Sequence, residues 1–110
     1  MTTTIRHHAY FGTMNFVFAL TDPMIAELER LTDTGIGAIY QRVVAGAFSM
    51  IDLPEIIRLG LIGGGTAPQD AARLTDTYAR NRPMAEVFPL ALDILDARWS
   101  GSPQGQEVAA

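Results

Sequence analysis

The glycine run that ends at Gly65 is the part of the sequence with the spacing of a known ligand-binding motif. Gly60 and Gly65 are separated as in a phosphate-binding loop, and Thr66 follows directly. Such a loop also needs a lysine between its last glycine and the threonine, and it follows a strand. The chain contains no lysine, and the residues before the glycines have a helical pattern. We therefore interpret the run as a turn between two helices, where glycine supplies a positive φ.

Histidine and aspartate pairs are the next candidates, for a metal site or an acid–base site. His7 and His8 are adjacent, so on a strand they point to opposite faces and are poorly placed to bind one metal. Asp93 and Asp96 share a helix face, but the residues between them belong to the core side, which predicts a solvated pair. No serine lies in a nucleophile elbow, and the chain has no cysteine. The sequence therefore predicts no catalytic residue, no metal and no cofactor, in a protein that is not an enzyme.

The charge of the chain argues against nucleic acid as a partner. The net charge is −4 and all eight cations are arginine, whereas binding to a phosphate backbone needs clustered positive charge. The segments around the glycine turn loosely resemble a helix-turn-helix, but the second helix would carry a neutral set, namely Asp70, Arg73, Asp76 and Arg80. A DNA-binding regulator is therefore a remote alternative. Arg58 is expected to pair with a carboxylate such as Glu55 or to contact a partner protein.

Length and composition bound the architecture. A chain of 110 residues with 48% hydrophobic residues suits one domain with its own core. No apolar run reaches the roughly 18 residues that span a bilayer, and the polar N-terminus lacks the pattern of a signal peptide. We therefore expect a cytoplasmic protein with no membrane partner. Residues 1–100 are predicted to form the domain, and residues 101–110, which are small and polar, a disordered tail.

Periodicity predicts an α+β fold that is predominantly helical. Residues 5–20 alternate apolar and polar side chains as a β-hairpin does, and Gly12 is the natural turn position. Five short helices are expected after the hairpin, over about residues 23–31, 36–45, 53–62, 67–80 and 83–99. The sequence therefore predicts one compact domain in which the hairpin packs on the helices or pairs with another chain.

Local signals place the helix ends. Asp22 before Pro23 is predicted to cap the first helix, and either Asp52 or Leu53 the third. Thr66 and Gln69 have the spacing of a capping box at the start of the fourth. Pro89 lies inside the pattern of the fifth helix, where it would kink the helix or mark its true first turn.

An apolar stretch between the second and third helices is the candidate surface for a partner. Phe48, Met50 and Ile51 lie in this loop, and Met24 is a further candidate on the first helix. Methionine side chains adapt to varied partners, and a helix of another protein could bind against such residues. The alternative is that these four side chains fill the core.

The order of the segments also resembles the gene transfer agent family of phage-like tail proteins. The segments are FGTMNFVFALT, MIAELERLTDTGIGAIYQRVVAGAF, DLPEIIRLGLIGGGTAPQDAARL and PMAEVFPLALDILDARWSG, which together cover roughly residues 10–101. The residues that match the family pattern are Glu27, Leu28, Glu29, Arg58, Gly60, Leu61, Gly63, Gly64 and Gly65. The resemblance implies a protein of a prophage or gene transfer agent tail module, without a catalytic role for these residues.

Two functions compete within that resemblance. The family is labelled as tail tube protein, and it is also similar to tail assembly chaperones, which coat the tape-measure protein before the tube forms around it. A tube subunit needs extended β-sheet, whereas this sequence predicts one hairpin and five helices. We therefore expect a chaperone that binds the tape-measure protein or other tail proteins, with a structural tube or connector component as the alternative. An exposed hairpin edge would also allow a homo-oligomer.

Overall fold

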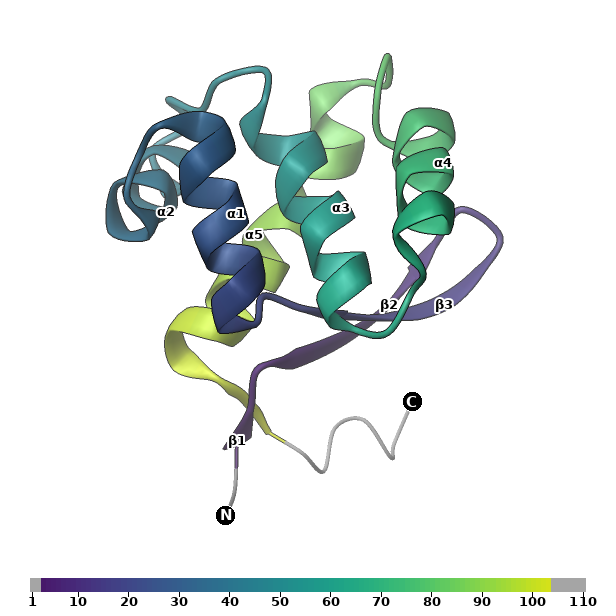
Figure 1. Ribbon diagram of the computed structural model, residues 1–110. Helices are drawn as coiled ribbons and strands as arrows, with labels where there is room; N and C mark the ends of the chain where they lie inside the picture. Colours follow the sequence, from purple (N-terminus) through teal and green to yellow (C-terminus); the bar gives the residue numbers. More distant parts are fainter. Residues whose placement is uncertain (1–2, 104–110) are drawn as a thin grey trace.

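The computed structural model describes residues 3–103, which form five helices and two small sheets (Figure 1). The elements follow one another as β1 (Thr3–Thr4), β2 (Arg6–Phe11), β3 (Met14–Ala19), α1 (Asp22–Thr32), α2 (Ile36–Val44), α3 (Asp52–Gly63), α4 (Pro68–Tyr78), α5 (Met84–Ser100) and β4 (Ser102–Pro103). The predicted fold class is confirmed: a helical α+β domain with an N-terminal hairpin. None of the helices between residues 3 and 103 combines the length and the apolar character needed to cross a bilayer.

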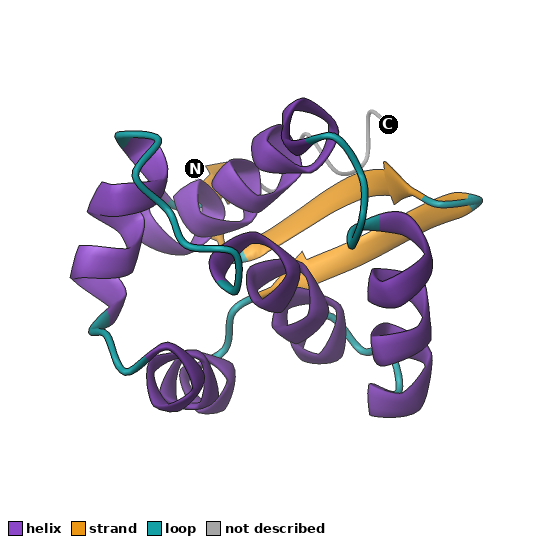
Figure 2. Ribbon diagram, turned by 90° about the horizontal axis from the view of Figure 1, so that it is seen from above, coloured by secondary structure: helices purple, strands orange, loops and turns teal. Residues whose placement is uncertain are grey.

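The hairpin of β2 and β3 runs across the layer of helices (Figure 2). Its two-residue loop begins with Gly12 at a φ of 69°, while Thr13 has no positive φ, as in a type II′ turn. The core-facing rings of Phe11 and Phe18 are buried and meet edge to face with centroids 6.0 Å apart. Tyr78 of α4 packs edge to face on Phe11 from the other side. The hairpin is therefore held by an aromatic cluster that connects it to α4.

Helix α3 is the centre of the domain and lies between α1 and α4 in Figure 1. It is buried on nearly all sides rather than along one stripe, because β3, α1, α4 and α5 all pack against it. Its buried apolar side chains are Leu53, Ile56, Ile57, Leu59 and Leu61. The helix therefore has no wide polar face toward solvent, unlike an ordinary surface helix.

Two glycines bring the end of α3 into backbone contact with β3. A Cβ atom on Gly63 would collide with the carbonyl oxygen of Ala19, and one on Gly64 with that of Val17. Gly65 then takes a φ of 114° and its N–H donates to Ile62, which with the following N–H completes a Schellman motif. The glycine run is therefore a helix–helix turn, as predicted. It is also the place where the backbone of β3 packs against the end of α3.

The predicted caps of α1, α3 and α4 are wrong. The N-cap of α1 is Thr21 and that of α4 is Ala67, and neither side chain accepts a capping hydrogen bond. Asp22 instead accepts a hydrogen bond from the guanidinium of Arg98 at 2.8 Å. Thr66 lies one residue before the α4 cap, because Pro68 occupies the first turn of α4. The backbone N–H of Thr66 instead donates to the carbonyl oxygen of Leu61 at the end of α3.

The two ends of the described segment, residues 3–103, meet in a second small sheet. β1 pairs antiparallel with β4, and β4 lies beyond the predicted domain boundary at residue 100. Residues 104–110, the remainder of the predicted tail, lie outside the described residues.

Pro89 lies within α5, which begins five residues earlier at Met84, so it does not mark the first turn. Asp52 likewise begins α3 as a helical residue and is not its cap.

A buried hydroxyl gives a test of the packing. Thr75 of α4 is fully buried, and its Oγ1 has no hydrogen-bond partner among the described residues. Thr75→Val is expected to raise the free energy of unfolding by about 1 kcal/mol, because it removes an unpaired polar group while keeping the shape. Urea unfolding measures this, with Thr75→Ser as the control that keeps the hydroxyl. Equal or lower stability of the valine variant would mean that the hydroxyl is satisfied in solution.

Candidate partner-binding surface

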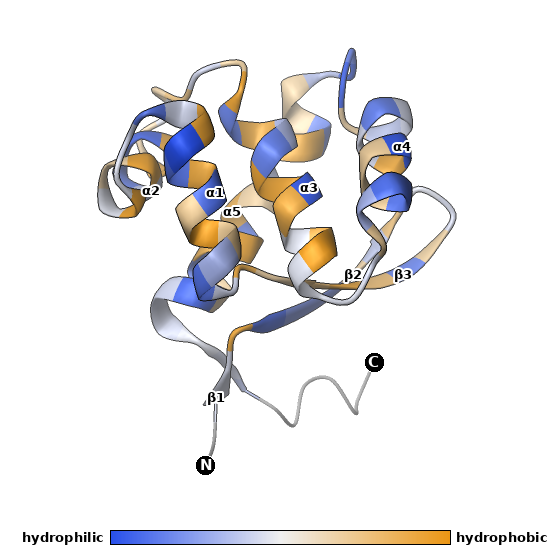
Figure 3. Cartoon of the chain, viewed as in Figure 1, coloured by the Kyte–Doolittle hydropathy of each residue, from blue (hydrophilic) through white to orange (hydrophobic). Residues whose placement is uncertain are grey.

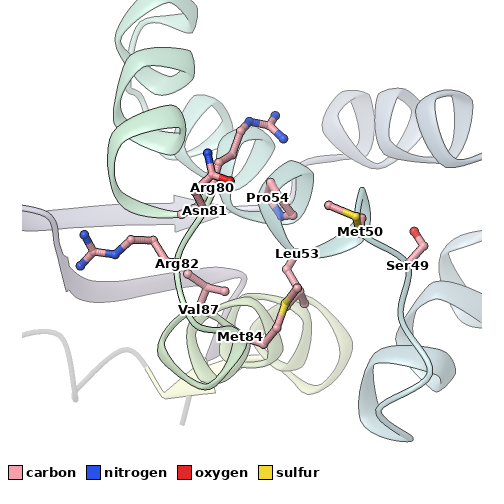
Figure 4. A pocket seen from close by; sticks show the side chains of 10 residues that line it. Ser49, Met50, Leu53, Pro54, Arg80, Asn81, Arg82, Met84 and Val87 are labelled. Atoms are coloured by element: carbon pink, nitrogen blue, oxygen red, sulfur yellow. The ribbon is translucent and has the colours of Figure 1, made fainter.

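Exposed apolar side chains lie at and beside a pocket at one end of α3, and Met50 and Met84 are among the residues that line it. Met50, Ile51 and Met84 form the patch, which we call the methionine surface, with exposed fractions of 82%, 49% and 51%. The pocket, of about 190 Å³, is lined by Leu53 and Val87 among others (Figure 4). Large apolar side chains exposed together on a well-packed domain are typical of a site that another molecule covers.

Two loops bring these residues together. Met50 and Ile51 lie between α2 and α3, after Gly46 at a φ of 76°, and Met84 opens α5. Between α4 and α5 the chain turns at Asn81, whose φ of 57° is tolerated by asparagine, and Pro83 is the N-cap of α5. The surface is therefore built from loop ends rather than from one helix face.

A buried ion pair holds the first of these loops. Asp52 is fully buried and accepts hydrogen bonds from Nε and Nη2 of Arg42 at 2.7 and 2.6 Å. The backbone N–H and hydroxyl of Ser49 donate to the same carboxylate at 3.0 and 3.1 Å. Burial alone would raise the pKa of Asp52, but Arg42 and Ser49 outweigh it and hold that pKa below its ordinary value. The network ties the residues next to Met50 to α2.

The structure brings only part of the predicted partner-binding set together. Met50 and Ile51 are exposed as a surface requires, whereas Phe48 is partly buried and stacks on Phe88 with ring centroids 5.7 Å apart. Met24 packs against the core near Gly63, at the opposite end of α3, a helix about 18 Å long. Met84, which the sequence analysis did not select, takes a place in the surface instead.

The two members of each histidine or aspartate pair have different surroundings, and one histidine lies near one aspartate. His7 and His8 lie on opposite faces of β2, and Nε2 of His7 is 3.8 Å from the Asp93 carboxylate of α5. Burial lowers the pKa of His7, and the charge of Asp93 opposes that shift. Asp96 accepts a hydrogen bond from the hydroxyl of Tyr40 at 2.6 Å. Within residues 3–103, no three metal-binding side chains come together.

Comparison with known proteins gives the chain its family. The model of a family described as phage tail tube protein, GTA-gp10, matches residues 4–101. The chain belongs to the GTA-gp10 family. No match was found among curated proteins or among solved structures. The GTA-gp10 match covers every helix and the hairpin, so the domain as a whole is a phage or gene transfer agent tail protein, of a kind that is generally non-catalytic.

The motif residues of this GTA-gp10 family protein have structural contacts. Leu28 and Leu61 are fully buried, and Gly60 packs against Ile94 of α5. Glu27 pairs with Arg30, while Glu29 accepts a hydrogen bond from the N–H of Ile36 at 2.8 Å and so caps α2. These residues position α1, α2 and α3 relative to one another.

The predicted pairing of Arg58 is confirmed. Its Nη2 donates to Oε1 of Glu55 at 2.6 Å, and Oε2 of the same carboxylate accepts from Arg80 at 3.0 Å. Glu55 is buried, so the two arginines share one carboxylate that joins α3 to the end of α4. Arg73 of α4 also pairs with Asp70, and Arg80, which follows the C-cap of α4, also pairs with Asp76 of that helix.

Two features of the methionine surface in this GTA-gp10 family protein were not predicted from the sequence. The Arg42–Asp52 pair joins residues ten positions apart across a loop, a separation with no helical or strand period. Met84 follows Pro83 in a sequence typical of a helix start, and none of its neighbours in the chain indicates that it lines the same pocket as Met50. In both cases the contact depends on the path of the loops through space, and the residues next to each other in the sequence do not indicate that path.

Proposed function

We propose that this protein is a tail assembly chaperone that binds helical segments of the tape-measure protein in the cytoplasm before the tail tube forms. The observation that carries the proposal is the methionine surface, where exposed apolar side chains from two loops lie at and beside one pocket. The other exposed large apolar side chains, which lie outside this surface, are Tyr10, Met14, Val44 and Trp99. A long helical partner presents apolar residues along one face. Unbranched methionine side chains can adjust to such faces as their sequence varies, and Met50 and Met84 supply two of them.

The amount and position of β-structure also support the chaperone. The described residues form two sheets of two strands each. In the sheet of β1 and β4, each strand is only two residues long. A ring-forming tube subunit would need extended sheet to join its neighbours. The description of the family as tail tube protein supports the alternative, a structural component of the tube.

Substitution within the methionine surface tests the proposal. The variant Met50→Ser with Met84→Ser is expected to lose at least about tenfold in affinity for a soluble tape-measure segment, because two apolar anchors are removed. The affinity is measured by isothermal titration. Met14→Ser is the matched control, since Met14 is also exposed but lies at the hairpin tip.

Co-expression gives the second readout. An aggregation-prone tape-measure fragment is expected to remain soluble with the native chain and to precipitate with the double variant. If the fragment is equally insoluble with and without the native chain, the chaperone proposal fails. Polymerisation of the purified chain alone into tubes would favour the structural alternative.

A further inference from the structure

A further pocket lies on the side of the molecule away from α4, where α1, α2 and the end of α5 meet (Figure 1). Its volume is about 330 Å³, and it is lined by Ile25, Ile36, Tyr40, Leu95, Arg98 and Trp99. The rings of Tyr40 and Trp99 stack nearly parallel with centroids 4.5 Å apart, and Trp99 is 60% exposed. We call this site the tryptophan pocket. Its floor is apolar and one of its rings is open to a partner.

The net charge of the protein is concentrated on the elements that form this pocket. From Asp22 to Asp33, α1 and its C-cap carry four carboxylates and one arginine, and α5 from Asp93 onward carries two carboxylates and one arginine. Elsewhere in the sequence six arginines and six carboxylates cancel, so these two segments account for the whole net charge of −4. Figure 3 shows the strongly hydrophilic positions of α1 between hydrophobic ones. This side of the domain therefore attracts a cationic partner.

Two carboxylates are held beside the pocket by neutral groups. Asp96 accepts a hydrogen bond from the hydroxyl of Tyr40 at 2.6 Å, and Glu29 accepts one from the N–H of Ile36 at 2.8 Å. Among residues 3–103, neither carboxylate is paired with an arginine. Both side chains are partly buried, which reduces the screening of their charge by salt. They therefore keep a negative charge next to the apolar floor.

The arginine of the pocket does not neutralise these two carboxylates. Nη1 of Arg98 donates to the carbonyl oxygen of Leu20, and Nη2 donates to the carboxylate of Asp22, each at 2.8 Å. These bonds fix the guanidinium at the start of α1, where Asp22 offsets its charge. A cation from outside therefore meets carboxylates that are still available to it.

We propose that the tryptophan pocket binds an arginine of another protein, presented next to an apolar residue of that protein. The guanidinium stacks on the exposed ring of Trp99 and pairs with the carboxylate of Asp96, while the aliphatic stem lies on the apolar floor. Asp96 and Trp99 are three residues apart on α5, so one guanidinium can contact both. Arginine suits this site better than lysine, because its planar group stacks and pairs at once. The site goes beyond the proposed binding of the tape-measure protein and does not use the methionine surface.

The apolar surface continues beyond the pocket, which favours a protein segment over a small cation. Ile36, Tyr40 and Val44 are spaced four residues apart and so lie along one face of α2. Val44 is 53% exposed, so an apolar side chain that neighbours the bound arginine can pack against it. The surface therefore fits a segment that combines the two kinds of residue.

The fluorescence of Trp99 reports directly on this site, because Trp99 is the only tryptophan in the sequence. The full chain is titrated at low salt with a short acetylated and amidated peptide in which one arginine lies between two leucines. A saturable change in emission is expected. The peptide Kd is expected to rise at least about tenfold when glutamine replaces the arginine, because the charged hydrogen bonds are lost. N-acetylarginine amide alone is expected to bind more weakly than the peptide.

Paired substitutions separate the charge of this site from charge in general. Asp96→Asn combined with Glu29→Gln removes two carboxylates but keeps an oxygen that can accept each hydrogen bond. This variant is expected to raise the peptide Kd at least about fivefold. Asp70→Asn combined with Asp76→Asn removes the same charge from α4 and is the matched control, expected to leave the Kd unchanged.

Several results would overturn the proposal. These are the absence of a saturable change in emission, equal affinity for the glutamine peptide, and equal effects of the two paired substitutions. N-acetylarginine amide that binds as tightly as the peptide would assign the pocket to a small cation instead. Emission that changes with protein concentration alone, together with a dimer by light scattering, would assign it to a second copy. Met50→Ser with Met84→Ser is expected to leave peptide binding unchanged, so loss of tape-measure binding in that variant bears on the proposed function alone.

Discussion

Gly64→Ala is expected to abolish most of the stability of this domain. The added Cβ would overlap the carbonyl group of Val17, which belongs to the backbone and has no rotamer in which to move away. The cost is on the order of 3 kcal/mol or more, because α3 and β3 must separate. That is a large share of the 5 to 15 kcal/mol that typically stabilises a domain, as a rough guide. The φ of Gly64 is −84°, which alanine adopts freely, so the effect comes from contact and not from backbone strain.

Gly37→Ala is the matched control for this prediction. Gly37 lies inside α2, and a Cβ there would meet nothing within 4 Å. The substitution is expected to leave stability unchanged or to raise it by about 0.5–1 kcal/mol through helix propensity. Urea unfolding followed by circular dichroism compares the two variants. A Gly64→Ala protein as stable as the native chain would show that α3 and β3 do not need this spacing.

Arg42→Met is expected to destabilise the protein by about 3 kcal/mol near neutral pH. The substitution keeps much of the side-chain volume but leaves the fully buried carboxylate of Asp52 without its charge partner. Breaking one side of a buried pair costs more than the pair contributes, because the remaining charge is neither solvated nor neutralised. The loop that carries Met50 loses its tie to α2 as well.

The pH dependence of stability gives this prediction a signature. In the native chain the pKa of Asp52 is below its ordinary value of 3.8, so its stabilising contribution is present above pH 3.8 and is lost as the pH falls through the lower folded pKa. In Arg42→Met, burial is expected to raise that pKa above 3.8, so protonation favours the folded state. The difference in stability between the two proteins should therefore narrow as the pH falls.

An exposed ion pair is the control for the loss of an arginine. Arg73→Met removes the pair with Asp70, in which both side chains are more than half exposed, and is expected to change stability little. Thermal unfolding from neutral to acidic pH measures all three proteins. If Arg42→Met and Arg73→Met have equal effects, the Arg42–Asp52 pair does not hold the loop.

The helices and the hairpin could be predicted from the chain alone, because they rest on short-range chemistry. Alternating side chains and Gly12 indicate the hairpin, and the spacing of apolar residues indicates five helices. The pair between Arg58 and Glu55 could also be predicted, since residues three apart on a helix are neighbours. The resemblance to the gene transfer agent family predicted a phage-like tail protein, and the family match over residues 4–101 confirms that prediction.

Contacts between distant segments could not be predicted in this way. From the sequence, Gly63 and Gly64 are expected only to form a turn, whereas in the structure they also pack against the backbone of β3. Asp52 is expected to cap a helix, whereas in the structure its carboxylate pairs with Arg42. Met84 joins Met50, and Met24 lies at the other end of α3, because two loops and the path of α3 set those positions. The side chains of a segment indicate its own secondary structure, whereas a surface or a backbone contact depends on how distant segments pack together.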